Sequence, residues 1–312
     1  MKGTETGLDQ AVSDFLAHVK AQGGSARTDD FYVNALRKRF LPWCRAEGIT
    51  APGQLDQATL NRFNVYLLRP DSGRGGQPLA KDSVKSYLRG VRGFISWTAK
   101  EGLTAERLKV QSVKVPHKVL DTLTRAEIAQ MEAAADSERD RLIIRLLGDS
   151  GIRLGELLAL KPDSLTVQGR QHYITVDGKG SRQRLVPILP ALADRLRKYA
   201  EKGRPADDYS GRIFIGLRRH SGSHAALTAR GVQTMLEAVA RKAGITKAVN
   251  PHAFRHAMAT NTLRAGGNPI SLMGTLGHSS LKMIESTYSH LVASDRHAEM
   301  MRVLAADGDG GK

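Results

Sequence analysis

The chain has 312 residues, 41% of them hydrophobic, and its 47 lysines and arginines outnumber 31 aspartates and glutamates, giving a net charge of +16. This length suits two domains, and such an excess of positive charge favours a polyanionic partner such as nucleic acid. The single cysteine, Cys44, excludes an intrachain disulfide and a thiolate metal cluster. The sequence shows no signal peptide and no apolar stretch of bilayer length, so we expect a cytoplasmic protein with no membrane partner.

Amphipathic helices are predicted throughout the first hundred residues. Apolar residues recur at three- and four-residue steps in VSDFLAHVK, FYVNALRKRFLPWC, ATLNRFNVYLLR and KDSVKSYLRGVRGFISWTAKEG. The Gly/Pro-rich segment PDSGRGGQP, between the last two, predicts a loop. We therefore expect four or five helices within residues 8–103, in a domain that covers residues 1–110. The basic, aperiodic stretch from about 104 to 120 predicts an interdomain linker, which we assign to residues 111–120.

The second domain, residues 121–312, begins with a capping-box pattern at Thr124 and Glu127 before an apolar run. Helices are predicted in RLIIRLLGDSG, ending at Gly151, and in RLGELLALK. Three short strands follow in LTVQG, HYITVDG and QRLVPI, and we expect them to form one antiparallel sheet. Helices resume in LADRLRKYAEKG, RGVQTMLEAVARKAG and the last eighty residues, and the tail AADGDGGK is expected to be disordered. The predicted fold class is mainly α with a small antiparallel β-sheet.

The segment that begins at Asn250 has the residues of a helix start that can bind an anion. Asn250 is a typical N-cap, and Pro251 suits the first helical position. His252 and Arg255 then lie three residues apart on one face, near the electropositive end of the helix. An anion bound there would meet backbone N–H groups, an imidazole and a guanidinium together. A second Asn-Pro pair starts the next predicted helix at Asn268.

Each of these features alone has an ordinary structural explanation. A histidine and an arginine three residues apart most often mark a solvated helix face, and a lone Tyr288 is most often a partly buried tyrosine. His252 and His256 have the spacing of metal ligands, but the glutamate of zinc protease motifs and a third ligand are not evident, which argues against zinc. The segment GKGS lacks the earlier glycine of a phosphate-binding loop, because Tyr173 stands at that position, so a P-loop is rejected.

Taken together and in order, the features match one family. The segments SGIRLGELLALK, DGKGSRQRLVPI, HAFRHAMATNTLRAGG and LGHSSLKMIESTYSHL resemble the signatures of the tyrosine recombinase (phage integrase) family, and the resemblance extends over residues 121–300. The interval of 23 residues from Arg255 to His278 and that of ten residues from His278 to Tyr288 agree with the family pattern. Three departures from the family's usual residues fall outside the catalytic positions: Ala253, Gly274 and Thr275. The resemblance implies a catalytic set of Arg153, Lys179, His252, Arg255, His278 and Tyr288, with Glu156 in support.

The implied reaction is an attack by Tyr288 on a DNA phosphate, which leaves a 3′-phosphotyrosine and a free 5′-hydroxyl. A free tyrosine hydroxyl has a pKa of about 10, so cationic neighbours are needed to favour the phenolate. Arg153 and Arg255 would bind the nonbridging oxygens, where negative charge accumulates. Lys179, at the tip of a hairpin, would protonate the leaving 5′-oxygen.

Two histidines and a glutamate complete the implied site. His252 would assist proton transfer at the phosphate, and His278 would donate a hydrogen bond to it. Glu156 would orient the arginines rather than take part in the chemistry. The phosphotyrosine bond has an energy similar to that of a phosphodiester, so religation would need no ATP, no metal and no other cofactor.

The resemblance also implies an architecture and partners. A SAM-like core-binding domain and the catalytic domain would form a two-domain clamp on double-stranded DNA. A homotetramer would act on two paired sites with short inverted repeats, through a Holliday junction, and a second recombinase is a conceivable heteromeric partner. The segment ASDRHAEMMRVLAA would be a C-terminal exchange helix that passes to a neighbouring subunit, with packing on its own domain as the alternative. The absence of an arm-binding segment before residue 8 favours a simple Xer-like or small-element enzyme, bound to the bacterial nucleoid when on DNA.

Two other functions remain open at this point. A type IB topoisomerase shares the chemistry but relaxes DNA as a monomer, and the helical N-terminal domain and the His-x-x-Arg box favour a recombinase over it. A DNA-binding accessory protein would retain the fold without catalysis. Such a protein usually lacks the tyrosine, lysine or arginine of the set, and here all of them are present.

Overall fold

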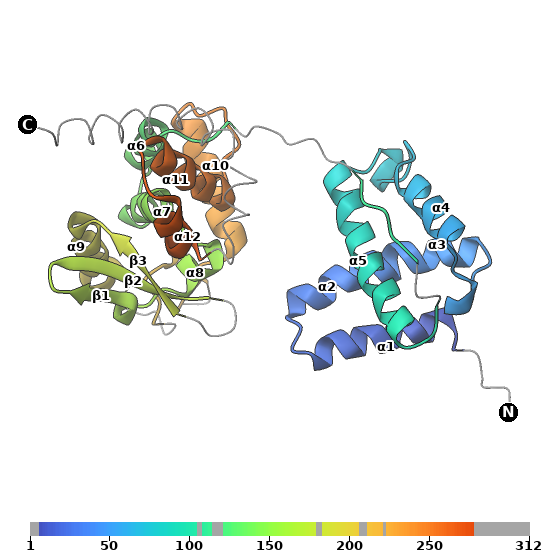
Figure 1. The fold of residues 1–312 in the computed structure, drawn as a ribbon. Helices are drawn as coiled ribbons and strands as arrows, with labels where there is room; N and C mark the ends of the chain where they lie inside the picture. The colour runs from blue at the N-terminus through green and yellow to red at the C-terminus, as the bar shows by residue number, and fades with distance from the viewer. Residues whose placement is uncertain are drawn as a thin grey trace, which may run out of the picture. The chain divides into compact units, whose positions relative to one another are not determined.

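The computed structural model describes residues 6–104, 108–113, 121–178, 183–205, 211–220 and 223–277. The chain divides into two compact units, residues 1–119 and 120–312 (Figure 1). Each unit has its own hydrophobic core and is described by itself. Among the described residues, no helix is both long enough and apolar enough to cross a bilayer.

The first unit is built from helices, as the apolar periodicity predicts. They are α1 (Leu8–Ala21), α2 (Ala26–Ala35), α3 (Leu41–Ala46), α4 (Gln57–Leu67) and α5 (Lys81–Lys100), and a π-helical turn at Leu36–Phe40 joins α2 to α3. Aromatic rings from four of these segments meet edge to face in the core, with centroids 5.0 to 6.3 Å apart: Phe15, Phe40, Phe63 and Phe94. Such contacts stabilise a small helical core beyond the area that they bury.

Part of the stretch predicted as linker packs on the first unit. Val110 is buried in the core of that unit, and its carbonyl oxygen accepts a 2.8 Å hydrogen bond from the Arg92 guanidinium on α5. The Gln57 side chain exchanges two hydrogen bonds with the backbone of Lys109. The partly buried Val113 packs against the same core, so the chain contacts the first unit as far as Val113, within the predicted linker. An isolated apolar residue has no periodicity, so the sequence pattern did not predict this contact.

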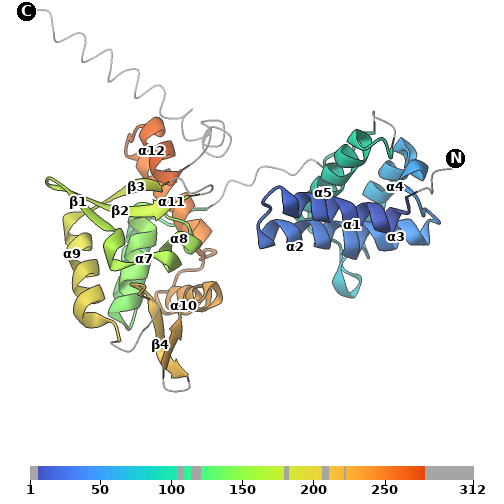
Figure 2. The same cartoon turned by 90° about the horizontal axis from the view of Figure 1, so that it is seen from below.

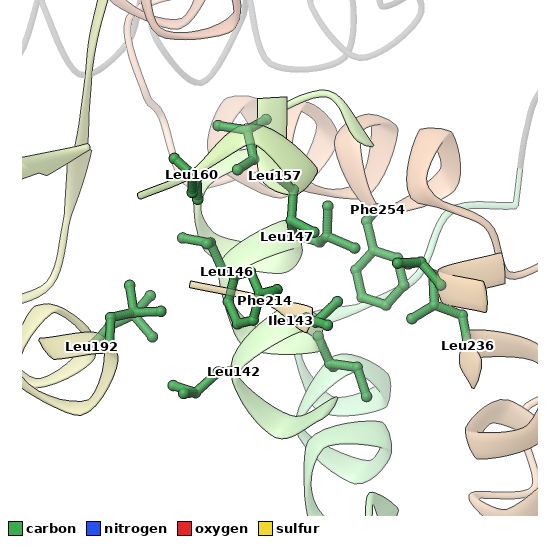
Figure 3. Close-up of a cluster of buried hydrophobic side chains, with 14 of the residues drawn as sticks. Leu142, Ile143, Leu146, Leu147, Leu157, Leu160, Leu192, Phe214, Leu236 and Phe254 are labelled. Atoms are coloured by element: carbon green, nitrogen blue, oxygen red, sulfur yellow. The ribbon is translucent and has the colours of Figure 1, made fainter. Parts of the chain in front are cut away.

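The second unit has seven α-helices among its described residues. They are α6 (Arg125–Ala134), α7 (Glu138–Ser150), α8 (Leu154–Ala159), α9 (Pro190–Lys198), α10 (Ala229–Lys242), α11 (Pro251–Arg264) and α12 (Pro269–Leu276). Helix α7 lies at the centre and packs against α6, α9 and α11 (Figure 2). Its apolar face meets side chains from the surrounding elements in one cluster (Figure 3), which includes Leu142, Ile143, Leu146, Leu147, Leu157, Phe214, Leu236 and Phe254.

The predicted three-stranded sheet is confirmed. Strands β1 (Leu165–Gln168), β2 (Gln171–Asp177) and β3 (Gln183–Ile188) are antiparallel in the order β1-β2-β3, with Val176 opposite Arg184 in the register of β2 and β3. Alternate residues on β2 and β3 are buried, and α7 and α9 pack against these strands. Because side chains alternate between the two faces of a strand, Arg184 shares the inward face of β3 with the buried Val186 and Ile188.

A second, two-stranded antiparallel sheet corrects the prediction that only helices follow the first sheet. It consists of β4 (Ile215–His220) and β5 (Ser223–Ala226), with an irregular register between Ile215 and Arg219. Only the start of this hairpin is apolar, and the run LRRHSGSHAA shows no alternation of apolar and polar residues. The sequence therefore lacked the two-residue periodicity from which a strand is predicted. The fold class itself, mainly α with small antiparallel sheets, is confirmed.

The predicted helix ends of the second unit are confirmed in their hydrogen bonds. Thr124 and Glu127 form the reciprocal capping box of α6, with distances of 2.7 and 3.2 Å. Gly151 ends α7 with a φ of 60°, in the left-handed region that glycine adopts without strain. The side-chain oxygens of Asn250 and Asn268 accept hydrogen bonds from backbone N–H groups in the first turns of α11 and α12. Local sequence thus fixes where the helices that carry the candidate residues begin and end.

Candidate active site

Arg153 and Glu156 form a closed pair at the start of α8. Arg153 is the N-cap residue, and its backbone N–H donates to Glu156 Oε2 from 2.8 Å while its guanidinium donates to Oε1 from 2.9 Å. The third contact of Arg153 is a 3.2 Å hydrogen bond from its guanidinium to the carbonyl oxygen of Gly277. The Arg153 side chain is 47% exposed, whereas that of Glu156 is only 7% exposed. The buried Glu156 carboxylate therefore holds the Arg153 guanidinium in a position where it faces solvent.

A third residue, Arg184 on β3, completes the environment of the Glu156 carboxylate. Its two terminal nitrogens donate to Oε1 and Oε2, both from 2.8 Å, in the parallel geometry that a guanidinium and a carboxylate favour. Each Glu156 oxygen thus accepts two hydrogen bonds. Burial alone would raise the pKa of Glu156, but the hydrogen bonds from Arg184 and Arg153 outweigh it and hold that pKa below its usual range. The carboxylate is ionised at neutral pH.

Arg255 lies on the inward side of α11 and is only 7% exposed. Its guanidinium donates to the carbonyl oxygen of Gly151, at the end of α7, and to that of Leu276, at the end of α12. The motifs imply equivalent roles for Arg153 and Arg255 as phosphate ligands. The structure gives them different surroundings, because one is half-exposed and bonded to a carboxylate while the other is buried and bonded to helix ends.

The end of α12 is where the three arginines converge. The carbonyl oxygens of residues 275, 276 and 277 accept one hydrogen bond each, from Arg184, Arg255 and Arg153 respectively. The last carbonyls of a helix have no partner within the helix and carry partial negative charge, so cationic donors suit them. We refer to this arrangement, three arginines on the carbonyls of residues 275–277, as the arginine clamp. It joins β3, α8 and α11 to the point where the chain leaves α12.

His252 and His256 lie one turn apart on α11 and contact each other. Their Nε2 atoms are 2.9 Å apart, so one ring donates a hydrogen bond and the other accepts it, with ring centroids 4.3 Å apart. Partial burial and, second, the charge of Arg255 lower the pKa of His252. Burial, then His252 and Arg255, lower the pKa of His256 to about 4. Within the described part of the chain, no third histidine, cysteine or carboxylate joins this pair as a metal-binding group.

The structure places four of the seven residues implied by the sequence, and it brings Arg153, Glu156 and Arg255 to the end of α12. The other three lie outside the described residues: Lys179, His278 and Tyr288. The proposed C-terminal exchange helix and tail lie outside them as well. Sequence reasoning missed Arg184, for which a signal existed. Arg184 alternates with the apolar residues Val186 and Ile188 along β3, which places it on the inward face. A charged residue on that face needs a partner of opposite charge.

Comparisons with known proteins decide the family. Residues 121–294 match the model of the phage integrase family. The tyrosine recombinase XerC of Xanthomonas campestris is 32% identical over 289 residues, which cover 90% of this chain and 84% of the relative. The tyrosine recombinase XerA of Thermococcus kodakarensis is 28% identical over 305 residues, which cover 96% of this chain and 99% of the relative. The chain belongs to the phage integrase family.

A tyrosine recombinase of the Xer type is thus confirmed, and with it an enzyme that cleaves and rejoins DNA strands in site-specific recombination. A solved structure of the XerH recombinase, bound to its palindromic difH substrate after cleavage, superposes with a TM-score of 0.71 at 19% identity. That alignment covers 93% of this recombinase and 85% of XerH. At such low identity the likeness shows the fold alone, and the fold agrees with the one described above.

Proposed function

We propose that Tyr288 is the nucleophile of this recombinase and that Arg153 and Arg255 bind the nonbridging oxygens of the scissile phosphate. One observation carries the assignment of the arginines. They come from α11 and from the start of α8, yet Arg255 donates to the carbonyl of Leu276 and Arg153 to that of Gly277, directly before the segment that carries the proposed nucleophile in the sequence. Two guanidiniums gathered at the start of that segment suit a reaction whose transition state accumulates negative charge.

The proton transfers follow from the same assignment. As the Tyr288 oxygen forms its bond to phosphorus, the bond from phosphorus to the 5′-oxygen breaks, and the tyrosine gives up its proton. His252 is able to accept that proton because its lowered pKa keeps the imidazole neutral at neutral pH. Lys179 donates a proton to the leaving 5′-oxygen, and His278 donates a hydrogen bond to the phosphate. Glu156 takes no part in proton transfer, because its carboxylate is ionised and each of its oxygens already accepts two hydrogen bonds.

The substrate that fits this chemistry is a pair of double-stranded DNA sites with short inverted repeats. We propose that residues 1–110 grip the DNA as a core-binding domain and that four subunits assemble on two paired sites, with a C-terminal helix exchanged between neighbours. Strand exchange then passes through a Holliday junction. The proposal includes assemblies of two kinds of subunit, with a partner recombinase beside this one. The net charge of +16 supports DNA binding, and we place the enzyme in the cytoplasm, on the nucleoid when bound.

A nicked suicide duplex tests the nucleophile. The duplex carries the cognate site with a nick beside the cleavage position, so that the short 5′-hydroxyl fragment diffuses away and religation is prevented. The wild-type enzyme is expected to form a covalent adduct that survives denaturant, without added metal or ATP. Tyr288→Phe is expected to form none while binding the duplex with wild-type affinity. An adduct from Tyr288→Phe, or none from the wild type on its own site, overturns the mechanism.

Assembly on DNA separates recombinase from topoisomerase. A recombinase is expected to pair two duplexes and to yield Holliday junctions and exchanged arms, which native gels and junction-specific digestion detect. A type IB topoisomerase would relax a supercoiled plasmid as a monomer and give no exchange. Relaxation without any paired complex would therefore contradict the proposed function.

A further inference from the structure

Arg184 has no role in the catalytic set implied by the family resemblance, yet it bonds to two separate parts of the site. It is the second residue of β3, five positions after Lys179 in the sequence, and its side chain is 14% exposed. Three of its N–H groups are engaged, two by the Glu156 carboxylate and one by the carbonyl oxygen of Thr275 at 2.9 Å. A buried guanidinium with this many partners has one fixed position.

The first consequence concerns Arg153. The Glu156 carboxylate is the only described acid that contacts Arg153, and Arg184 fixes both oxygens of that carboxylate. Without Arg184 the carboxylate would keep its two hydrogen bonds from Arg153 but lose one donor on each oxygen, so the Arg153 guanidinium would be held less tightly. A displacement of about 1 Å in a phosphate ligand is enough to slow a reaction about 100-fold.

The second consequence concerns the end of α12. Arg184 bonds to Thr275, and a Cβ atom placed on Gly277 would lie 3.1 Å from Cδ and Nε of Arg184. The side chain thus passes directly against the backbone at residue 277, and a larger residue there would require it to shift by a few tenths of an ångström. Gly277 also has a φ of 63°, in the left-handed region, and this conformation ends α12. Arg184 therefore contacts both the carboxylate that supports Arg153 and the last turn of α12.

We propose that Arg184 is a positioning residue for strand cleavage: it holds Glu156 and the end of α12 in one geometry and does not touch the DNA. The inference rests on the proposed function, since it gives Arg153 and Tyr288 the roles assigned above. The chemical requirement is a planar guanidinium, because a lysine ammonium retains the charge but cannot donate to both carboxylate oxygens and to a carbonyl in this geometry. Loss of the Arg184 guanidinium is therefore expected to slow strand cleavage and to leave the affinity for DNA unchanged.

Arg184→Lys tests this requirement with a matched control. The control is Arg195→Lys, because Arg195 on α9 also bonds two carboxylates, those of Glu132 and Glu138, within a purely structural ion-pair group. We expect Arg184→Lys to lower the single-turnover cleavage rate on the nicked duplex by about 10- to 100-fold, the loss typical when the support of a ligand-binding side chain is removed. DNA affinity should stay close to wild type, and the variant should remain folded at the assay temperature although it loses hydrogen bonds to Glu156 and Thr275. Arg195→Lys should cleave at the wild-type rate.

A double-mutant cycle tests whether Arg184 acts through Glu156. Glu156→Gln alone is expected to slow cleavage, and adding Arg184→Lys should then slow it by less than about threefold, because contacting residues with a shared task are not additive. Losses that multiply in full, or Arg184→Lys cleaving as fast as wild type, would overturn the proposal. The proposal would also be overturned if Arg184→Lys were partly unfolded at the assay temperature and bound DNA more weakly in proportion to its lower cleavage rate. Such a result would show that Arg184 has a merely structural role. If wild type itself forms no Tyr288 adduct, the proposed function fails first.

Discussion

The guanidinium of Arg255 donates a 2.7 Å hydrogen bond to the backbone oxygen of Gly151, although the two residues are 104 positions apart in the sequence. Gly151 ends α7 and Arg255 is in the first turn and a half of α11, so this contact joins two helices of the second unit at their ends. The carbonyl oxygens at the end of α7 receive no hydrogen bond from an N–H group of their own helix, and a buried carbonyl oxygen needs a donor. Arg255 therefore stabilises the fold independently of any bound phosphate.

Arg255→Met should separate this structural role from catalysis. The variant keeps an apolar stem but removes the donors to Gly151 and Leu276, and each buried carbonyl left without a donor costs about 1–3 kcal/mol. We expect a lower Tm by scanning calorimetry and no adduct on the nicked duplex. Arg153→Met should also abolish the adduct, but its half-exposed guanidinium predicts a stability change below about 1 kcal/mol. Equal losses of Tm in the two variants would contradict these assignments.

Gly277→Ala should lower both stability and cleavage. At a φ of 63° an alanine is strained by about 1 kcal/mol, and its Cβ would press on Arg184 from 3.1 Å. Gly274→Ala, three residues earlier in α12, is the matched control. No described atom lies within 4 Å of a Cβ at Gly274, so this variant should gain about 0.5–1 kcal/mol from the higher helix propensity of alanine. Chemical denaturation and the adduct assay measure the two effects, and a neutral Gly277→Ala would disprove the close approach.

Thermal stability should decrease as the pH is lowered from about 6.5 to about 4, in part through His256. In the folded chain the pKa of His256 is lowered to about 4 from 6.5, so the unfolded chain takes up a proton in this interval and the folded chain does not. The contribution of His256 is complete above pH 6.5 and is lost by about pH 4. The Tm difference between wild type and His256→Asn should therefore narrow over this range. A difference that stays constant from pH 7 to pH 4 would contradict the lowered pKa.

Phe254→Ala should destabilise the second unit strongly. Phe254 lies between His252 and Arg255 in the sequence, but it is fully buried among α7 and α10 side chains (Figure 3). Truncation of a buried phenylalanine to alanine costs about 3–5 kcal/mol, whereas Phe254→Leu fills much of the space and should cost less. Urea unfolding followed by circular dichroism measures both. Similar losses for the two variants would indicate that packing at Phe254 is not what holds α11 in place.

Local rules of sequence predicted the ends of the helices that carry the site. Asn250 and Asn268 cap their helices and Gly151 ends α7 because each depends only on a few neighbouring residues. The three-stranded sheet was predicted for the same reason, since alternation within a strand is a local pattern. The hairpin of β4 and β5 was missed because its polar segment has no such pattern and its pairing depends on tertiary structure.

Motif order predicted which residues belong to the site but not how they contact one another. The fork between Arg184 and Glu156 joins positions 28 residues apart and depends on how β3 packs near α8. Likewise, no pattern indicated that Arg255 would be buried on carbonyls while Arg153 stayed half-exposed. His252 and His256 share a hydrogen bond, but the sequence shows only that they are four residues apart. That spacing is also typical of metal ligands, and a metal site was rejected on other grounds. The assignments of Lys179, His278 and Tyr288 stay predictions from the motifs.

The arginine clamp has a consequence for how the protein tolerates mutation. Its acceptors are main-chain oxygens, which are present whatever side chains stand at residues 275 and 276, so drift at these positions leaves the hydrogen bonds in place. This explains how Gly274 and Thr275 can depart from the family's usual residues at no cost to the clamp. Its donors are three particular guanidiniums, and none of them can change without loss. Mutational robustness is therefore one-sided: the side chains at residues 274 and 275 can vary without loss of the acceptors, while the arginines that donate to the helix end cannot.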